Sequence, residues 1–206
     1  RDNLGDWSSD VCSSDLALIP KRFLSRTLDN YQVEHEEQRR ALKFCRHYVA
    51  TFDQIREVGR CMVLIDKPGT GKTHLGVAMA NELLHKTSRT AVYRTVGAVL
   101  QAIKATFDRK SELSESDILS SLINPDLLVL DEIGVSKEQP SDFELTTLFA
   151  IINGRYEREA PTVIISNLGA GELGRAMGDR CVDRLREGGL IVVPFEWESQ
   201  RGKEGF

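Results

Sequence analysis

The segment DKPGTGKT, from Asp66 to Thr73, has the residue types and spacing of a loop that surrounds phosphate groups, a Walker A motif. Its glycines let the backbone turn so that N–H groups point inward at phosphate oxygens, and a helix beginning near Lys72 adds its positive dipole end. Lys72 can reach the β- and γ-phosphates of a nucleotide, and the Thr73 hydroxyl can coordinate Mg²⁺. We therefore expect ATP and Mg²⁺ as cofactors, held by Pro68, Gly69, Thr70, Gly71, Lys72, Thr73 and His74.

Asp66 departs from the phosphate-loop pattern G-x-x-x-x-G-K-[ST], because the first residue of that pattern is a glycine. A carboxylate at this position faces a site for a polyanion, so it would weaken nucleotide binding unless it is a sequencing error. The substitution leaves open the hypothesis of a nucleotide-binding scaffold without catalytic activity. ATP turnover measured with and without single-stranded DNA would distinguish that scaffold from an ATPase.

Two acidic residues, Asp131 and Glu132, follow the apolar run Leu127–Leu130, and Asp131 lies 58 residues after Thr73. The run indicates a buried parallel strand whose carboxyl end would lie beside the phosphate loop. There Asp131 can hold Mg²⁺ through water, and Glu132 can polarise the attacking water as a general base. This Walker B pattern, with Glu132 in place, favours a hydrolysing ATPase over a switch GTPase.

Two further polar residues could act on the nucleotide of their own subunit. Asn167 follows the apolar run Thr162–Ser166, and it would position the lytic water and sense the γ-phosphate if that strand lies beside the phosphate-loop strand. The alternative is an ordinary turn-forming asparagine. Arg201, after Trp197, is a candidate second sensor, with a plain tail arginine as the alternative.

Arg180 and Arg184 could act on the nucleotide of a neighbouring subunit. They are four residues apart and therefore share one face of the expected helix. A guanidinium from such a face stabilises charge on the transferring phosphoryl group, which is the arginine-finger role. A finger acting between subunits implies an ATP-dependent homo-oligomer. The alternative is a solvated surface network in which Asp183 pairs with Arg180 or Arg186.

These residues must be positioned by alternating strands and helices. Apolar runs predict buried strands at Cys61–Ile65, Thr90–Val96, Leu127–Leu130, Thr162–Ser166 and Leu190–Val193. Periodicity predicts helices at Val33–Phe52, Lys72–Lys86, Val99–Phe107, Ser114–Ile123, Ser141–Arg158, Leu173–Met177 and Val182–Glu187. The alternation predicts an α/β fold with a parallel sheet covered by helices on both faces. With the two phosphate-site motifs it resembles the P-loop AAA+ fold, which implies an α/β/α sandwich around a five-stranded sheet of order 5-1-4-3-2, without a sizeable C-terminal lid domain.

Composition adds limits on the class of protein. The 206 residues allow one α/β domain with a short extra segment, and the net charge of −4 gives no sign of bulk nucleic-acid binding. No apolar run is long enough to cross a membrane, and no basic-plus-apolar signal peptide begins the chain. The cysteines are far apart, without the spacing of a zinc site or a disulfide framework. We expect a cytoplasmic protein without a membrane partner.

The first sixteen residues, RDNLGDWSSDVCSSDL, lack helix or strand periodicity and are rich in Ser and Asp. The part DWSSDVCSSDL resembles a translated sequencing-library adapter, with a natural disordered tail as the alternative. We exclude this segment from the fold and expect a natural N-terminal sequence to be missing. The expected organisation is an adapter-derived segment at 1–16, a lead-in and N-terminal helix at 17–57, an ATPase core at 58–201 and a tail at 202–206.

Taken together, the motifs resemble those of DnaC-like helicase loaders, with the related IstB-type transposition helper ATPases close behind. The resemblance runs from about Ile19 to Arg201. It rests on KPGTGKTHL (Lys67–Leu75), LLVLDEIG (Leu127–Gly134), INGRYE (Ile152–Glu157), PTVIISNL (Pro161–Leu168), GDRCVDRLRE (Gly178–Glu187) and the final FEWESQR. It implies an ATPase that binds single-stranded DNA and helps to load the replicative helicase during replication initiation.

The resemblance also implies roles for individual residues. Arg184 matches the arginine-finger place, Arg180 an accessory place and Arg201 the second-sensor place. Lys104 and Phe107 match positions that contact single-stranded DNA, where Lys104 would meet a phosphate and Phe107 would stack on a base. For Phe107 the alternative is a core aromatic on an amphipathic helix. The resemblance places helicase docking in an N-terminal domain that we expect to be missing, and a transposase partner remains the alternative that gene neighbourhood would decide.

Overall fold

The computed structural model describes residues 17–108, 110–135 and 139–202. The adapter-like segment at 1–16 and all of the expected tail except residue 202 lie outside the described residues. Within the described ranges, none of the helices combines the length and the apolar character that a membrane span requires.

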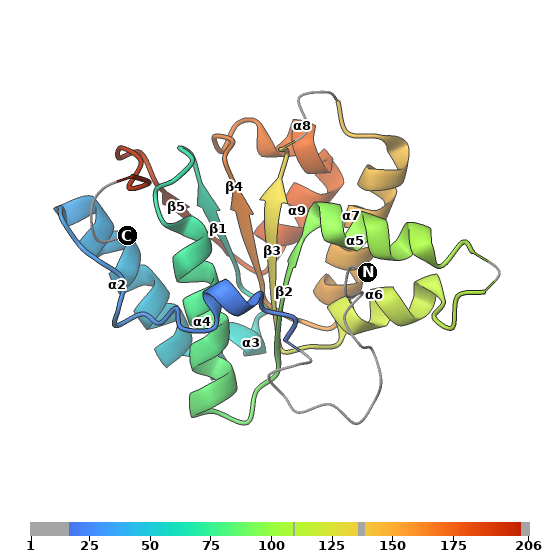
Figure 1. The fold of residues 1–206 in the computed structure, drawn as a ribbon, viewed down its shortest axis with the longest axis horizontal. Helices are drawn as coiled ribbons and strands as arrows, with labels where there is room; N and C mark the ends of the chain where they lie inside the picture. The colour runs from blue at the N-terminus through green and yellow to red at the C-terminus, as the bar shows by residue number, and fades with distance from the viewer. Residues whose placement is uncertain (1–16, 109, 136–138, 203–206) are drawn as a thin grey trace.

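One parallel sheet forms the centre of the molecule (Figure 1). Its strands are β1 (Cys61–Ile65), β2 (Ala91–Thr95), β3 (Leu127–Ile133), β4 (Thr162–Ser166) and β5 (Leu190–Pro194). Their order is β2-β3-β4-β1-β5, with every neighbouring pair parallel, which confirms the predicted order. In the three central strands every residue except Glu132 is buried, because helices cover both faces of the sheet.

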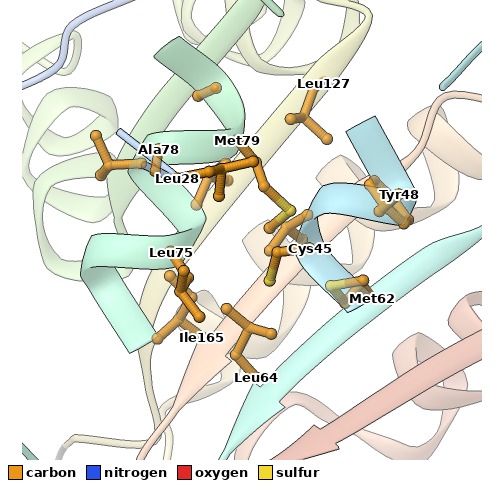
Figure 2. Close-up of a cluster of buried hydrophobic side chains, with 14 of the residues drawn as sticks. Leu28, Cys45, Tyr48, Met62, Leu64, Leu75, Ala78, Met79, Leu127 and Ile165 are labelled. Atoms are coloured by element: carbon orange, nitrogen blue, oxygen red, sulfur yellow. The ribbon is translucent and has the colours of Figure 1, made fainter. Parts of the chain in front are cut away.

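The helices form one layer on each face of the sheet, as Figure 1 shows. On one face lie α2 (Glu36–Ala50), α3 (Phe52–Glu57) and α4 (Lys72–Lys86). On the other lie α5 (Val96–Ala105), α6 (Glu115–Ile123), α7 (Asp142–Tyr156), α8 (Leu173–Met177) and α9 (Asp179–Glu187). Alternate strand residues enter the two cores, so that Met62 and Leu64 pack under α2 and α4 (Figure 2) while Val63 packs on the opposite face.

The lead-in before α2 is mostly irregular chain that packs along α4, with one short 3₁₀ helix, η1 (Lys21–Phe23). Leu28 in this segment is 1% exposed and belongs to the same core as α2 and α4 (Figure 2). The Asn81 side chain of α4 donates to the carbonyl oxygens of Phe23, Leu24 and Arg26. The lead-in is therefore fastened to the ATPase module by main-chain hydrogen bonds as well as by apolar contacts.

Several predicted boundaries were wrong for local reasons. The helix predicted at Val33–Phe52 is α2, which begins at Glu36 and ends at Ala50 because the chain leaves helical geometry at Thr51, where φ is −110°. The short helix α3, which begins at Phe52, was not predicted. Helix α5 starts at Val96, earlier than predicted, because the Thr95 hydroxyl caps it by accepting from the Ala98 N–H. Helix α9 begins at Asp179, directly after Gly178, whose φ is +87°.

Arg155 of α7 lies at the amino ends of the strands and is 1% exposed. Its guanidinium donates to the Thr162 hydroxyl and to the carbonyl oxygens of Leu122, Ile123, Pro125, Asp126 and Pro161. This one side chain thereby ties the end of α6 and the entries to β3 and β4 together. Burial lowers the pKa of Arg155 to about 10, which leaves the side chain cationic at neutral pH.

Candidate nucleotide-binding site

Thr73 and Asp131 meet at the carboxyl edge of the sheet. The loop after β1 leads into α4, whose second residue is Thr73, and the Thr73 hydroxyl donates to Asp131 Oδ2 over 2.8 Å. Hydroxyl and carboxylate oxygens are the hard ligands that Mg²⁺ prefers, and these two are close enough to share one ion. Within the described ranges no group of three or more His, Cys, Asp or Glu residues could hold a metal, so a magnesium ion here would also depend on phosphate oxygens.

The Asp131 carboxylate accepts two further hydrogen bonds. Tyr93 of β2 donates its hydroxyl to Oδ2 over 2.9 Å, and the Glu132 main-chain N–H donates to Oδ1 over 2.7 Å. Glu132 has a φ of +64°, which turns it out of the buried strand so that its exposed side chain lines the cleft. Sequence reasoning placed Glu132 but missed Tyr93, because an isolated tyrosine in a β-rich run carries no motif.

The phosphate loop has the left-handed backbone that its pattern predicts. Gly69 and Gly71 have φ values of +75° and +95°, and Asp66 also has a positive φ, of +79°. A glycine adopts this geometry without strain, which explains the first glycine of the pattern, while aspartate is one of the few other residues that tolerate it. A side-chain carbon at Gly71 would lie 2.8 Å from the Tyr31 ring, so this glycine is also required by close packing.

Lys72 is drawn into the loop and is 5% exposed. Its ammonium donates to the carbonyl oxygens of Asp66 and Lys67. Burial lowers the pKa of Lys72 to about 8, although the charges of Asp131 and Asp66 act in the opposite direction. The pKa is also lowered by the cationic Arg201, which lines the same cleft.

Segments from both ends of the domain fix the loop. The Tyr31 hydroxyl from the lead-in and the Trp197 indole N–H from the chain after β5 both donate to the Thr70 carbonyl oxygen, over 3.3 and 3.0 Å. The Gln200 main-chain N–H donates to the Gly69 carbonyl oxygen over 2.8 Å. Hydrogen bonds from both ends of the domain therefore hold the two loop carbonyl groups in place.

The cleft around the loop has a volume of about 640 Å³. It brings together most of the residues predicted to contact nucleotide: Gly69, Thr70, Gly71, Lys72, Thr73, His74, Asp131, Glu132, Asn167 and Arg201. Pro68 is outside this lining. His74 also turns toward the lead-in, where its Nε2 lies 3.0 Å from both the Thr27 carbonyl oxygen and Asn30 Oδ1.

The lead-in contributes cleft residues that sequence reasoning missed. They are Arg22, Phe23, Arg26, Tyr31, Gln32 and, at the start of α2, Gln38. One sequence feature could have indicated these cleft residues. Arg22 and Arg26 are two cations four residues apart in a segment before the phosphate loop. Their contact with the cleft depends on where the lead-in packs, which local sequence does not specify.

Arg180 and Arg184 lie on α9 and do not line this cleft. The Arg184 guanidinium donates to Asn153 and Glu187, both over 3.2 Å, and lies 4.6 Å from the centre of the Tyr156 ring. The Arg180 guanidinium lies 4.0 Å from the centre of the Phe149 ring. Within one chain, these arginines are therefore not brought to the phosphate loop.

Lys104 and Phe107 lie at the end of α5, also away from the cleft. Phe107 is 63% exposed, so the core-aromatic alternative is wrong. The Phe107 ring meets the Phe143 ring edge to face at 6.2 Å, and the Lys104 ammonium lies 5.6 Å from the centre of the Phe143 ring. The three side chains form a cationic and aromatic surface.

A family model described as IstB-like ATP binding protein matches residues 16–203. The chain belongs to the IstB-like ATP-binding protein family. This IstB-like chain is 39% identical to Replicative helicase loader DnaC of Escherichia coli strain K12 over 179 residues, which cover 86% of this chain and 69% of that protein. It is 35% identical to the protein of the same name from Buchnera aphidicola subsp. Acyrthosiphon pisum over 184 residues, covering 89% and 72%.

A solved structure supports the same relationship. The crystal structure of the DnaC helicase loader superposes with a TM-score of 0.73 at 26% identity, covering 84% of this chain and 99% of that one. The IstB-like chain thus has the P-loop AAA+ architecture predicted from its sequence, and the resemblance to DnaC-like loaders is confirmed.

Proposed function

We propose that this IstB-like chain is a magnesium-dependent ATPase that assembles on single-stranded DNA and helps to load the replicative helicase during replication initiation. The observation that carries the proposal is the 2.8 Å contact between Thr73 and Asp131 beside the phosphate loop, in a chain 39% identical to a replicative helicase loader. The contact joins the two side chains that a magnesium-bound triphosphate requires.

The cleft residues divide the work of hydrolysis. Inward main-chain N–H groups of the loop and the Lys72 ammonium bind phosphate oxygens. Thr73 and Asp131 would hold Mg²⁺, which neutralises phosphate charge when it is bound. Glu132, whose carboxylate faces the cleft, orients and deprotonates the attacking water, with Asn167 as its partner in positioning that water. Arg201 contacts the γ-phosphate from within the same subunit.

Arg184 acts as the arginine finger on the nucleotide of a neighbouring subunit, with Arg180 as an accessory. Their absence from the cleft of their own chain supports this division, because a group that works between subunits need not reach its own phosphates. The arrangement requires an ATP-dependent homo-oligomer.

Single-stranded DNA is proposed to bind at Lys104 and Phe107. The 63% exposed Phe107 ring can stack on a base while Lys104 contacts a phosphate. The replicative helicase is the proposed protein partner. A transposase is the alternative partner, favoured by the IstB-like description of the matching family model. Gene neighbourhood distinguishes the two, because replication or phage genes would indicate a helicase and a transposase gene would indicate a transposase.

The experiment that tests the proposal is ATP turnover by the purified chain with and without single-stranded DNA. We expect turnover that DNA stimulates, and its complete loss in Lys72→Ala because that variant lacks the ammonium that binds the terminal phosphates. Phe107→Ala should keep basal turnover and lose the stimulation. Turnover that survives in Lys72→Ala would rule out the assigned loop, and a wild-type chain that folds, binds ATP and never hydrolyses it would support the scaffold hypothesis.

A further inference from the structure

Tyr93 of β2 contacts the proposed magnesium-binding acid, Asp131, and lines the same cleft as the phosphate loop. Its hydroxyl and the Thr73 hydroxyl donate to the same oxygen, Asp131 Oδ2, over 2.9 and 2.8 Å. Both Tyr93 and Asp131 are 4% exposed, so water competes little for this hydrogen bond. The pair comes from neighbouring parallel strands, in which Thr95 of β2 is the residue level with Asp131.

The Thr73 and Tyr93 hydroxyls both donate to Asp131 Oδ2, but they should respond differently to a bound metal ion. The Thr73 oxygen is itself a proposed metal ligand, so its bond to Asp131 changes when it turns toward a cation. The Tyr93 hydroxyl is not a proposed metal ligand, and it reaches Oδ2 from β2. It can therefore hold this carboxylate oxygen in place when the Thr73 hydroxyl turns toward a cation.

Tyr93 is in turn fixed by the lead-in. Its main-chain N–H donates to the Ala17 carbonyl oxygen over 3.0 Å, and its ring meets the edge of the Phe23 ring at 6.1 Å. The lead-in therefore contacts Tyr93 through both its backbone and its ring.

We infer that Tyr93 is a positioning residue that orients the Asp131 carboxylate for magnesium, and that the lead-in holds Tyr93 in register. The inference rests on the proposed function, because the hydrogen bond from Tyr93 supports a carboxylate of the same proposed magnesium site. Groups that hydrogen-bond to a metal-binding carboxylate typically change metal affinity or activity by about 10- to 100-fold when they are removed.

The experiment measures how strongly magnesium and nucleotide bind together. The dissociation constant of the β,γ-methylene analogue of ATP is determined for the full chain in EDTA and in Mg²⁺, and the ratio of the two values gives the coupling factor. Tyr93→Phe removes only the hydroxyl, and we expect it to lower the coupling factor about tenfold while leaving the EDTA value unchanged. Asp131→Asn and Thr73→Ala should remove the coupling.

Tyr48→Phe is the matched control. Tyr48 is another buried tyrosine, and its hydroxyl donates to the Arg60 carbonyl oxygen over 2.6 Å, outside the cleft. This variant loses a comparable hydrogen bond and should keep the wild-type coupling factor. Equal thermal midpoints for the two phenylalanine variants, with different coupling factors, would separate positioning from general stability.

Two outcomes overturn the inference. A coupling factor in Tyr93→Phe that is unchanged, or higher than that of the wild type, would mean that the hydroxyl is irrelevant to magnesium or competes with it. If Tyr93→Phe lowers affinity equally in EDTA and in Mg²⁺, its role is structural. Retained coupling in Asp131→Asn and Thr73→Ala would instead refute the proposed metal site itself.

Discussion

Buried polar side chains at the two edges of the sheet have different surroundings. At the amino edge they are hydrogen-bonded within the fold, and at the carboxyl edge they line a cleft. At the amino edge, the buried Arg155 donates to six oxygens and ties three chain segments together. At the carboxyl edge, Asp66 and Glu132 have positive φ values, and a lysine is buried at the cost of a pKa lowered to about 8. Backbone strain and poorly solvated charge persist where the surrounding structure maintains them, and they concentrate at functional sites.

The comparison shows that a buried, hydrogen-bonded charged side chain does not by itself indicate a functional site. Arg155 is more deeply buried than Lys72, yet it serves the fold, because its donors join neighbouring chain segments and it does not line the cleft. Lys72 is within a cleft of about 640 Å³ and shares it with Asp131 and Arg201, charges that a triphosphate and its metal would complement. The following predictions test this difference between the two edges.

The largest expected effect concerns Arg184, which does not line the cleft of its own chain. Arg184→Ala should keep nucleotide affinity and lose turnover by about 10³-fold or more, because a finger acts on the transition state in the neighbouring subunit. Steady-state turnover and nucleotide binding measured on one preparation check it. Mixing Arg184→Ala with Glu132→Gln should restore part of the turnover, whereas unchanged turnover in Arg184→Ala alone would make it a surface residue paired with Glu187.

Arg155→Ala should have the next largest effect, a loss of about 3 kcal/mol in the free energy of unfolding. The substitution leaves several buried carbonyl oxygens without a donor. Urea unfolding measures the loss, with Arg158→Ala on the same segment as the control, since Arg158 is exposed. At urea concentrations below the unfolding transition, Arg155→Ala should bind nucleotide with wild-type affinity. A loss of nucleotide affinity in the folded variant would contradict a purely structural role for Arg155.

Substitution of Asp66 separates charge from backbone strain at the carboxyl edge. Asp66→Asn removes the carboxylate but keeps a residue that tolerates a positive φ, and we expect ATP affinity to increase about three- to tenfold, or about 1 kcal/mol. Asp66→Gly also removes the strain and should bind ATP at least as well. Equilibrium binding in several salt concentrations checks the cause, because an electrostatic gain decreases with added salt. A gain confined to Asp66→Gly would attribute the effect to the backbone alone.

The last expected effect is a pH dependence of stability due to Lys72. Its folded pKa of about 8 is below the ordinary value of 10.5, so folding disfavours the charged form. This penalty is complete below pH 8 and decreases between about pH 8 and 10, where the folded state releases its proton first. Wild type should therefore gain stability relative to Lys72→Met as the pH rises through that range, as measured by urea unfolding at each pH. A constant difference would contradict the lowered pKa.

The sequence predicted the parts of the site that depend on local spacing. The phosphate loop, α4 from Lys72 to Lys86, and β4 from Thr162 to Ser166 have the predicted bounds, because glycine positions and apolar periodicity act over a few residues. The meeting of Thr73 and Asp131 was also predictable, since the carboxyl ends of parallel strands in one sheet lie along one edge. Helix starts at Val96 and Asp179 were missed because the Thr95 side-chain cap and the positive φ of Gly178 are local features that periodicity does not report.

The sequence by itself determined the type of fold, the strand order and the loop that would bind phosphates. Only the tertiary structure decided that the lead-in lines the cleft, that Tyr93 donates to Asp131 and that Arg155 is a structural residue. The physical reason is the range of the interactions. Turns and amphipathic faces are specified by near neighbours, whereas a hydrogen bond between residues 38 positions apart exists only after the packed chain has placed both groups.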